Sequence, residues 1–459
     1  MPEDLSALSK GELVTIILKQ AREIETLKEV IIELQEKIKQ KTEGDNSSKS
    51  TPSWIKANVK KRTSGKRKLR DHGFGRSLDV PTKKVFHSFD CCPNCDGVLG
   101  KPSVAYSRQI IDIPVVQYEV VEHVVFKRYC FNCQRRFYPK VNLSQYVLGK
   151  GRIGINLMSA IFTMRQDSNM SVWQIKNHLK IFYHLELSLG EIIEILHQEA
   201  NLGEGEVEKI KQNLLLSKVI YADETGGREG GVNGYHWSFS NEQFQLLMYR
   251  KSRSAKVVKE VFGEEGENFE GVCVSDFYSS YNLYLGPHQR CWVHYLRDIK
   301  KLKEDNPKDR KLTTWAGNIH LLYKEAKSYP GPAPNLPPGQ KEQERTEKEK
   351  YFKEKLKSLC EPYLKTITPQ ATLSARAIKF LPEMFTFVRF EGVNPDNNMA
   401  ERAIRKTVLQ RKISFGTRSQ KGSKTGSILG SLFGTWRLQN LNPFEQMRLL
   451  LLNVSCQGV

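Results

Sequence analysis

The stretch from residue 217 to residue 278 constrains the fold most, because the spacing of apolar residues there changes from a helical period to a period of two. The segments SKVIYADET, YHWSFSN and FQLLMYRKS each alternate in this way, which predicts three consecutive β-strands. A short helical segment, SAKVVKEVFG, leads to a fourth predicted strand, GVCVSDFY, and we expect a fifth at HQRCWVH. Three strands, a helix and further strands predict a mixed α/β sheet.

Two aspartates end apolar strands of this predicted sheet. Asp223 follows VIYA, and Asp276 follows GVCVS. A carboxylate at the end of a buried strand costs free energy unless a cation or a hydrogen-bond donor meets it. Either residue alone fits an Asx turn or a cap. Two of them on neighbouring strands of a basic chain favour a divalent metal site, whose oxygen ligands suit Mg²⁺ or Mn²⁺.

A third carboxylate, Glu401, stands almost alone in a basic segment, NPDNNMAERAIRKTVLQRKISFGTRSQKGSK. Residues 394–398 supply turn and N-cap side chains, so we expect a helix to begin near Asp396 or Asn397. Local rules make Glu401 a surface partner of Arg405, in an ion pair worth about 0.3–0.5 kcal/mol. Beside Asp223 and the second strand-end aspartate, it becomes instead the candidate third ligand of two metal positions.

Three nearby carboxylates compete for these roles. Glu224 adjoins Asp223, but strand alternation points it to the other face of the sheet. Asp298 and Asp396 remain alternatives if the helix register differs from the expected one.

The charge of the chain indicates its partner. Its 459 residues contain 71 Lys+Arg and 51 Asp+Glu, a formal net charge of +20, which favours a polyanion such as nucleic acid. A membrane surface is the rival polyanion, but no apolar run approaches the ~20 residues that span a bilayer. The N-terminus lacks the layout of a signal peptide. We therefore expect an intracellular protein whose nine cysteines are thiols or metal ligands.

Residues 84–140 carry two C-x2-C motifs, in CCPNC and CFNC, separated by the strand-rich stretch YEVVEHVVFKRY. Four thiolates, with no open position for chemistry, predict a structural zinc ribbon. Cys91 is an alternative to the first cysteine of the first pair. The predicted ligands are Cys92, Cys95, Cys130 and Cys133.

The N-terminal segments predict a helix and a linker. Residues 11–41 place Ile17, Ile24, Ile31 and Ile38 at heptad position a and leucines at d, which favours a parallel two-stranded coiled coil; a helix packed on its own chain is the alternative. The polar segment that follows is a basic flexible linker, which either contacts phosphates or simply stays solvated. Its candidate DNA contacts are Lys60, Lys61 and Arg62.

Three further regions are expected to be helical. In residues 150–215, two capping-box patterns begin at Ser171 and Ser188, which suits either a helix-turn-helix that binds DNA or a helical bundle that joins two domains. Residues 301–383, interrupted by YPGPAPNLPPGQ, predict a helical insertion in the α/β domain. The tail NPFEQMRLLLLNV predicts a short amphipathic helix.

Four blocks, YADET, SDFYSSYN, RCWVHYLRDI and NPDNNMAERAIR…RKISFGTRSQKGS, resemble in order and spacing the transposases of the IS66 family of insertion sequences. The likeness covers nearly the whole chain, although KRTSGKRKLRDHGFGRS and GGREGGVN depart from the family's pattern. The resemblance implies a catalytic triad of Asp223, Asp276 and Glu401 on an RNase H-like fold, with two Mg²⁺ or Mn²⁺ ions. Cys291 and His294 resemble a C-x2-H signature that is structural or lies near the DNA; a zinc role is disfavoured.

By this resemblance, the chain cuts DNA at the ends of its insertion sequence and transfers the freed strand to target DNA. The basic residues around Glu401 would then hold phosphates, with a steep salt dependence of binding. These residues are Arg402, Arg405, Lys406, Arg411, Lys412, Arg418 and Lys421. The expected partners are the terminal repeats and target DNA, a second copy of the chain in a homodimer or higher oligomer, and accessory proteins encoded by the element. The expected location is the cytoplasm, on the nucleoid.

The predicted architecture is therefore a multidomain α+β protein. Two readings compete with a transposase: a zinc-ribbon DNA-binding regulator whose α/β domain is inactive, and a metal-dependent nuclease that cuts without joining. The expected parts are a coiled coil (1–42), a basic linker (43–83), a zinc ribbon (84–140), a helix-turn-helix-like region (141–216), an RNase H-like catalytic domain (217–435) with its helical insertion, and a helical tail (436–459).

Overall fold

The computed structural model describes residue 11, residue 14, residues 24–26, residue 28 and residues 80–111 and 116–457. The chain divides into two units, residues 1–112 and 113–459. The described residues of the first predicted helix are helical. The rest of that helix, its coiled-coil pairing and the linker up to residue 79, with Lys60, Lys61 and Arg62, lie outside the described residues. No helix in the described parts is long and apolar enough to cross a membrane.

The second unit begins with a small hairpin, β1 (Arg128–Cys130) paired antiparallel with β2 (Arg135–Phe137). The strands expected over YEVVEHVVFKRY are shorter than predicted, because residues 116–127 form no regular secondary structure. Their valines are exposed, so none of the described residues forms a second layer against which the period-two pattern could pack.

Three helices follow: α2 (Ile155–Gln166), α3 (Val172–Tyr183) and α4 (Leu189–Leu215). Both predicted capping boxes are confirmed. The Ser171 hydroxyl accepts from the Gln174 N–H at 3.2 Å, and the Ser188 hydroxyl accepts from the Glu191 N–H at 3.1 Å. The two helices are joined by residues 184–188. The helical prediction for this region is therefore confirmed, since each cap satisfies backbone donors that the first turn leaves free.

The mixed α/β sheet is also confirmed. Its strand order is β5-β4-β3-β6-β7, in which β3, β4 and β5 are antiparallel neighbours and β3, β6 and β7 run parallel. The strands β3 and β4 are longer than predicted, because GGREGGVN forms the end of their hairpin, with Gly230 and Gly231 at positive φ. The bounds are β3 (Val219–Glu229), β4 (Val232–Ser240), β5 (Gln245–Arg250), β6 (Val272–Ser275) and β7 (His288–Arg290).

Hydroxyl groups of α13 (Gln420–Leu438) cover the edge strand β5. The N–H groups of alternate β5 residues donate to a serine or threonine on each successive turn of α13, over distances of 2.8–3.0 Å. Four residues of a helix rise about 6 Å, and two residues of a strand rise about 6.6 Å. The spacing of the α13 hydroxyls therefore matches the spacing of the β5 N–H groups. The helix thus satisfies donors that an open sheet edge would expose. The pairs are Gln245 with Thr435, Leu247 with Ser431, and Tyr249 with Ser427.

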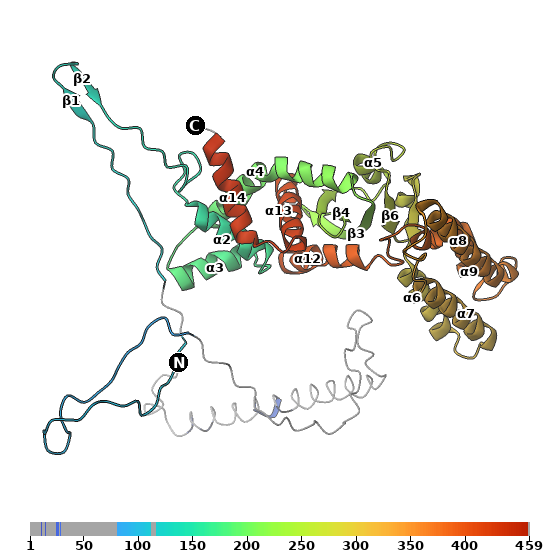
Figure 1. The fold of residues 1–459 in the computed structure, drawn as a ribbon, viewed down its shortest axis with the longest axis horizontal. Helices are drawn as coiled ribbons and strands as arrows, with labels where there is room; N and C mark the ends of the chain where they lie inside the picture. The colour runs from blue at the N-terminus through green and yellow to red at the C-terminus, as the bar shows by residue number, and fades with distance from the viewer. Residues whose placement is uncertain are drawn as a thin grey trace. The chain divides into compact units, whose positions relative to one another are not determined.

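The predicted helical insertion is confirmed and has its own apolar core, which includes Trp292, Trp315 and Phe385. Its helices extend from one end of the sheet (Figure 1). The insertion begins earlier than expected: the segment CWVH was predicted as a strand, but Trp292 opens a helix. The bounds are α6 (Trp292–Asp305), α7 (Arg310–Lys327), α8 (Pro338–Cys360), α9 (Ala371–Lys379), α10 (Leu381–Met384) and α11 (Thr386–Arg389).

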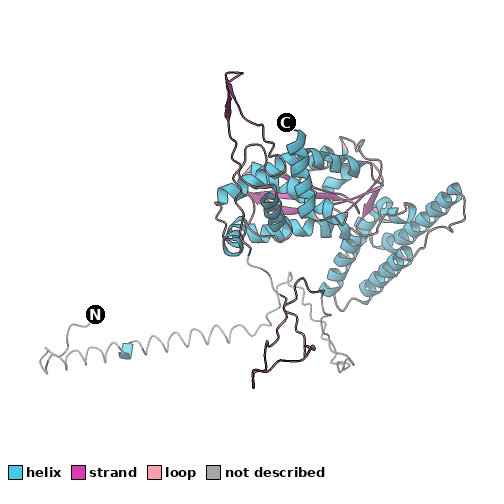
Figure 2. Cartoon of the chain, turned by 60° about the vertical axis from the view of Figure 1, so that its left-hand side comes forward, coloured by secondary structure: helices cyan, strands magenta, loops and turns pink. Residues whose placement is uncertain are grey.

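The two faces of the sheet are covered differently. The helix α12 (Asn398–Ser414) lies over the face of Tyr221 and Val274, where a small apolar cluster includes Ala400. The opposite face, with Ile220 and Ala222, belongs to a larger core shared with α2, α4 and α5 (Lys256–Phe262). The tail forms α14 (Pro443–Gln457), as predicted, and packs against α2. Helices therefore surround the sheet, which is magenta in Figure 2.

Candidate active site

Asp223 lies on β3, and Asp276 directly follows the neighbouring strand β6, which ends at Ser275. The parallel ladder of the two strands ends with the pair Tyr221 and Val274. Continued by two residues, this register brings Asp276 level with Asp223. Alternation along β3 turns Asp223 to the face of Tyr221, which α12 covers.

The surroundings of Asp223 oppose its ionisation. Burial, together with the negative charges of Glu224, Asp276 and Glu401, raises the pKa of this carboxyl to about 7. The backbone N–H of Glu224 donates to Asp223 Oδ1 at 3.0 Å, which partly offsets the rise. The second strand-end carboxylate, Asp276, accepts from the Tyr278 N–H at 2.8 Å. The three predicted carboxylates are therefore close enough to affect one another's charge.

A buried asparagine fixes the start of the helix that carries Glu401. Asn397 Nδ2 donates to the carbonyl of Ala222 at 2.7 Å, directly beside Asp223 on β3. The backbone N–H of Asn397 donates to Cys291 Sγ at 3.2 Å. The helix begins where the sequence predicts, but the side chain of Asn397 makes no N-cap bond. Its amide instead ties α12 to β3.

Glu401 faces the start of α6 rather than Arg405. Its Oε1 atom lies 3.7 Å from His294 Nε2 and 3.7 Å from Arg297 Nη2. The C-x2-H motif explains this arrangement, because Cys291 caps α6 and His294 comes one turn later. Cys291 is fully buried, and burial raises the pKa of its thiol. Sequence reasoning missed Arg297, although its spacing of three residues from His294 puts both on one helix face.

The three carboxylates do not converge on one point. In the described part of the chain, no three His, Cys, Asp or Glu side chains lie near enough together to hold an ion. The shared metal site thus stays a prediction for Asp223, Asp276 and Glu401. The negative charges of the three carboxylates repel one another. The carboxylate of Glu401 lies near His294 and Arg297 instead of near the two aspartates.

The competing carboxylates have partners elsewhere. Glu224 Oε1 accepts from Arg253 Nε at 2.9 Å and its Oε2 accepts from the Tyr281 hydroxyl at 2.5 Å, on the opposite face of the sheet. Asp298 forms an ion pair with Arg376, and Asp396 lies 3.8 Å from Lys327 Nζ. These pairings leave the first-choice carboxylates as the better candidates.

The seven predicted phosphate-binding cations differ in their surroundings. Lys406 Nζ donates to the Asp167 carbonyl at 2.8 Å and lies 4.2 Å from the ring centre of Phe433. Arg411 donates to Thr225 Oγ1 at 3.2 Å, and Lys421 pairs with Glu194 at 3.3 Å. The exposed members are Arg402, Arg405, Lys412, Arg418 and Lys421.

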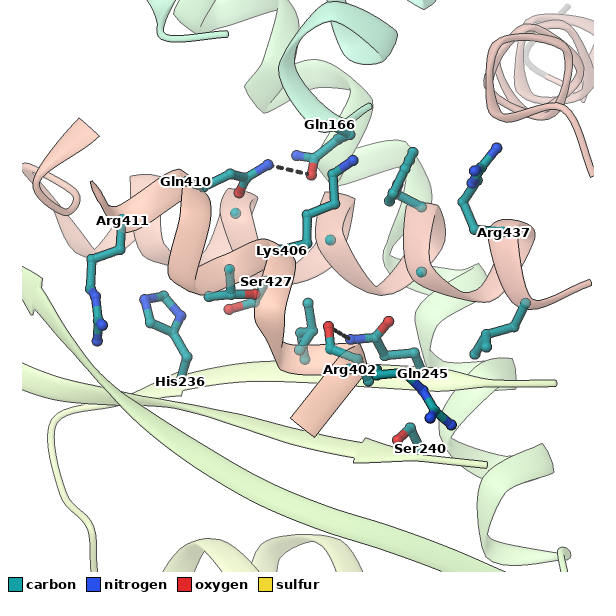
Figure 3. A pocket seen from close by; sticks show the side chains of 18 of the residues that line it. Gln166, His236, Ser240, Gln245, Arg402, Lys406, Gln410, Arg411, Ser427 and Arg437 are labelled. Atoms are coloured by element: carbon teal, nitrogen blue, oxygen red, sulfur yellow. Dashed lines mark hydrogen bonds between the residues drawn. The ribbon is translucent and has the colours of Figure 1, made fainter. Parts of the chain in front are cut away.

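A cavity of about 550 Å³ separates α12 from α13 above β4 and β5. Arg402, Lys406 and Arg411 line it from α12, and His236 lies beside Arg411 at one end (Figure 3). Burial and the charge of Arg411 lower the pKa of His236 to about 4, so the imidazole is neutral at pH 7. Part of the basic face of α12 is therefore turned inward.

The two C-x2-C loops have the same local design, although they belong to different units. In the first unit, N–H groups from Asn94 and Cys95 lower the pKa of the Cys92 thiol. In the second, the N–H of Cys133 points at Cys130 Sγ from 3.5 Å and lowers that pKa. In each loop the residue after the second cysteine has positive φ, 55° for Asp96 and 49° for Gln134. Each loop thus favours a thiolate; the joint zinc site stays a prediction.

Comparisons with known proteins agree with this organisation. Residues 150–425, more than half of the chain, match the family model described as transposase IS66 family. Residues 90–134, which include both C-x2-C motifs, match the model of the zinc-finger binding domain of transposase IS66. No curated protein matches the chain.

Proposed function

The chain belongs to the IS66 family of transposases, and on that premise we propose that it cuts the DNA ends of its insertion sequence and joins them to target DNA. The proposed site is Asp223, Asp276 and Glu401 on an RNase H-like sheet with a helical insertion. The observation that carries the proposal is that Asp276, at the end of β6, and Glu401, on α12, both lie near enough to Asp223 on β3 to raise its pKa. Such a cluster of acids is costly unless it serves a cation.

The residues fit a divalent metal. All three donors are carboxylate oxygens, which Mg²⁺ and Mn²⁺ prefer. A cation between them would relieve the repulsion that raises the pKa of Asp223. When bound, such ions stabilise the charge that develops on a phosphate during in-line displacement.

The chain's own residues position this site. Asp223 and Asp276 belong to a hydrogen-bonded sheet, and Asn397 holds Glu401's helix against Ala222. His294 and Arg297 restrain Glu401 from the insertion side. Because the pKa of Asp223 is about 7, the site must release a proton to take a cation at lower pH. Metal affinity should therefore rise from pH 6 to pH 8.

The zinc finger and the N-terminal region complete the proposal. Cys92, Cys95, Cys130 and Cys133 would hold one Zn²⁺ ion, and the lowered thiol pKa of Cys92 and Cys130 suits metal-bound thiolates. Four sulfur ligands leave no open position, so the zinc would be structural. We further propose that the coiled coil joins two copies of the chain, each of which binds one DNA end, with accessory proteins of the element as further partners.

Incubation of the full chain with labelled element-end DNA and Mg²⁺ tests the function. We expect cut and joined products from the native chain. Asp223→Asn, Asp276→Asn and Glu401→Gln should each lower the cleavage rate at least about 1000-fold, because several kcal/mol of charge stabilisation is lost. DNA binding should change less than about twofold. Asp298→Asn, which removes a carboxylate already paired with Arg376, is the matched control and should stay active.

Each of the other outcomes would indicate a different function or a different active site. Binding without metal-dependent cleavage by the native chain would indicate a DNA-binding regulator. Cleavage without joined products would indicate a nuclease. Normal cleavage by Glu401→Gln would refute the assignment of the triad.

A further inference from the structure

A second hollow lies along β3, beyond Asp223. Its volume is about 610 Å³, and it is lined in part by the backbone of Gly226, Gly227 and Gly234. A Cβ atom at Gly226 would meet only Arg411 Nη1, at 3.8 Å, so the space there is open. The side chains that line the hollow are Arg228, Asn233, Tyr235, Arg411, Lys412 and Phe415.

Phe415, at the rim, is unusual in two respects. Its side chain is 84% exposed, although it is large and apolar. Its φ of 57° lies in the left-handed region, which is rare for a bulky residue and costs conformational free energy. The conformation ends α12, whose C-cap is Phe415, and it leaves a large apolar side chain in solvent beside the hollow.

The backbone around Phe415 is held in place. The N–H of Phe415 donates to the Arg411 carbonyl at 2.8 Å. The N–H of Thr417 donates to the Arg228 carbonyl at 2.9 Å, and the N–H of Gly230 donates to the Thr417 carbonyl at 2.9 Å. The segment after α12 is thereby bonded to the far end of β3, so the Phe415 backbone stays beside the hollow.

The chemistry of the hollow suits a nucleotide. Arg228, Arg411 and Lys412 are cationic, and none of the described residues that line it is acidic. Arg228 Nε donates to Asn233 Oδ1 at 3.3 Å, which leaves the amide NH₂ of Asn233 as a donor. Aromatic rings that stack on bases, combined with cations that bind phosphates, are the usual means of holding single-stranded DNA.

The hollow and the candidate triad belong to the same strand but to opposite faces of the sheet. Gly226 is three residues from Asp223 along β3, a distance of about 10 Å at 3.3 Å per residue, and strand alternation puts it on the face of Glu224. Tyr235, which also lines the hollow, lies beneath Arg253, the partner of Glu224. The hollow is therefore a site separate from the triad.

We propose that this hollow holds one unstacked nucleobase of bound DNA, stacked on Phe415 and with its phosphates bound by Arg228 and Lys412. This inference rests on the proposed function, because it takes DNA as the substrate. Removing a base from the duplex costs free energy, which stacking on an exposed aromatic ring offsets. The hollow therefore favours DNA that already contains an unpaired base.

Metal-free binding by the full chain tests the inference. The probes are a fully paired 20-base-pair duplex and the same duplex with three central unpaired nucleotides, one of them the fluorescent base 2-aminopurine; EDTA prevents cleavage. We expect the native chain to prefer the second probe and to quench its fluorescence. Phe415→Ala should weaken binding of that probe about 5- to 30-fold and remove the quenching. Phe415→Trp should restore both.

A control and two outcomes decide the result. Leu285→Ala alters another strongly exposed apolar residue (72% exposed) and should leave both probes unaffected. Native-like binding of both probes by Phe415→Ala, or an equal loss on both, would overturn the inference. The assay needs no cleavage, so a chain that prefers the unpaired probe but never cuts DNA would contradict the proposed function alone.

Discussion

Two adjacent carboxylates on β3 belong to opposite faces of the sheet and have opposite surroundings. The side chain of Glu224 is 2% exposed, and Arg253 and Tyr281 bind both of its oxygens. Asp223 is also largely buried, but its neighbours include two further acids, Asp276 and Glu401. Burial raises the pKa of Glu224 as well, but its bonds to Tyr281 and Arg253 oppose that rise, and its removal would leave Arg253 without a partner. A buried carboxylate that faces other carboxylates lowers stability, and its retention is best explained by a ligand.

Removing Glu224 should cause the largest loss of stability. Glu224→Ala leaves Arg253 and the buried Tyr281 hydroxyl without their carboxylate, so we expect the free energy of unfolding to fall by about 2–3 kcal/mol. Urea unfolding followed by circular dichroism measures this. Glu264→Ala removes a carboxylate that is 78% exposed and pairs with Lys259; it should cost less than about 1 kcal/mol. Equal losses of unfolding free energy in Glu224→Ala and Glu264→Ala would mean that the buried contacts of Glu224 stabilise the fold no more than a surface ion pair does.

Asp223→Asn should have the opposite effect and raise the free energy of unfolding. The pKa of Asp223 is raised from about 3.9 to about 7, so between these values the folded chain binds a proton that the unfolded chain does not. Native stability therefore falls as pH rises through this window. The Asp223→Asn variant does not lose stability in this way. Its free energy of unfolding should therefore equal that of the native chain at pH 4 and exceed it by roughly 1–4 kcal/mol at pH 8.

Unfolding midpoints measured in metal-free buffer at several pH values test this prediction. Glu264→Gln changes an exposed carboxylate and should show no such trend. A stability difference between native chain and Asp223→Asn that does not vary with pH would mean that Asp223 is not the carboxyl whose ionisation burial opposes.

The smallest expected effect is on the salt dependence of DNA binding, in which two adjacent cations of α12 should differ. Arg405 is exposed, whereas Lys406 donates to Asp167 and lies over Phe433. If Arg405 binds a phosphate, Arg405→Ala should reduce the slope of log K against log salt by about 0.9, whereas Lys406→Ala should leave the slope unchanged. Fluorescence anisotropy with duplex DNA between 50 and 200 mM salt would measure both. A reduced slope for Lys406→Ala alone would reverse their roles.

Much of the fold could be predicted because its signals are local. The period of two in residues 217–252 and the serines at 171 and 188 report on neighbours within a few residues, and both predictions are confirmed. The helix α13 was missed, since its glycines and hydroxyls weaken the helical pattern. The strand predicted over HQRCWVH is confirmed only for residues 288–290, because the insertion core buries Trp292 on a helix.

The sequence by itself determined the strands, the capped helices, the two C-x2-C loops and the identity of the three candidate carboxylates. The tertiary structure alone decided that Asp223 and Asp276 are level, that Asn397 ties α12 to β3, and that Glu401 faces His294 instead of Arg405. These contacts join segments that are far apart in the sequence, so no periodic pattern encodes them. They follow from strand register and from the burial of polar groups that must each find a partner.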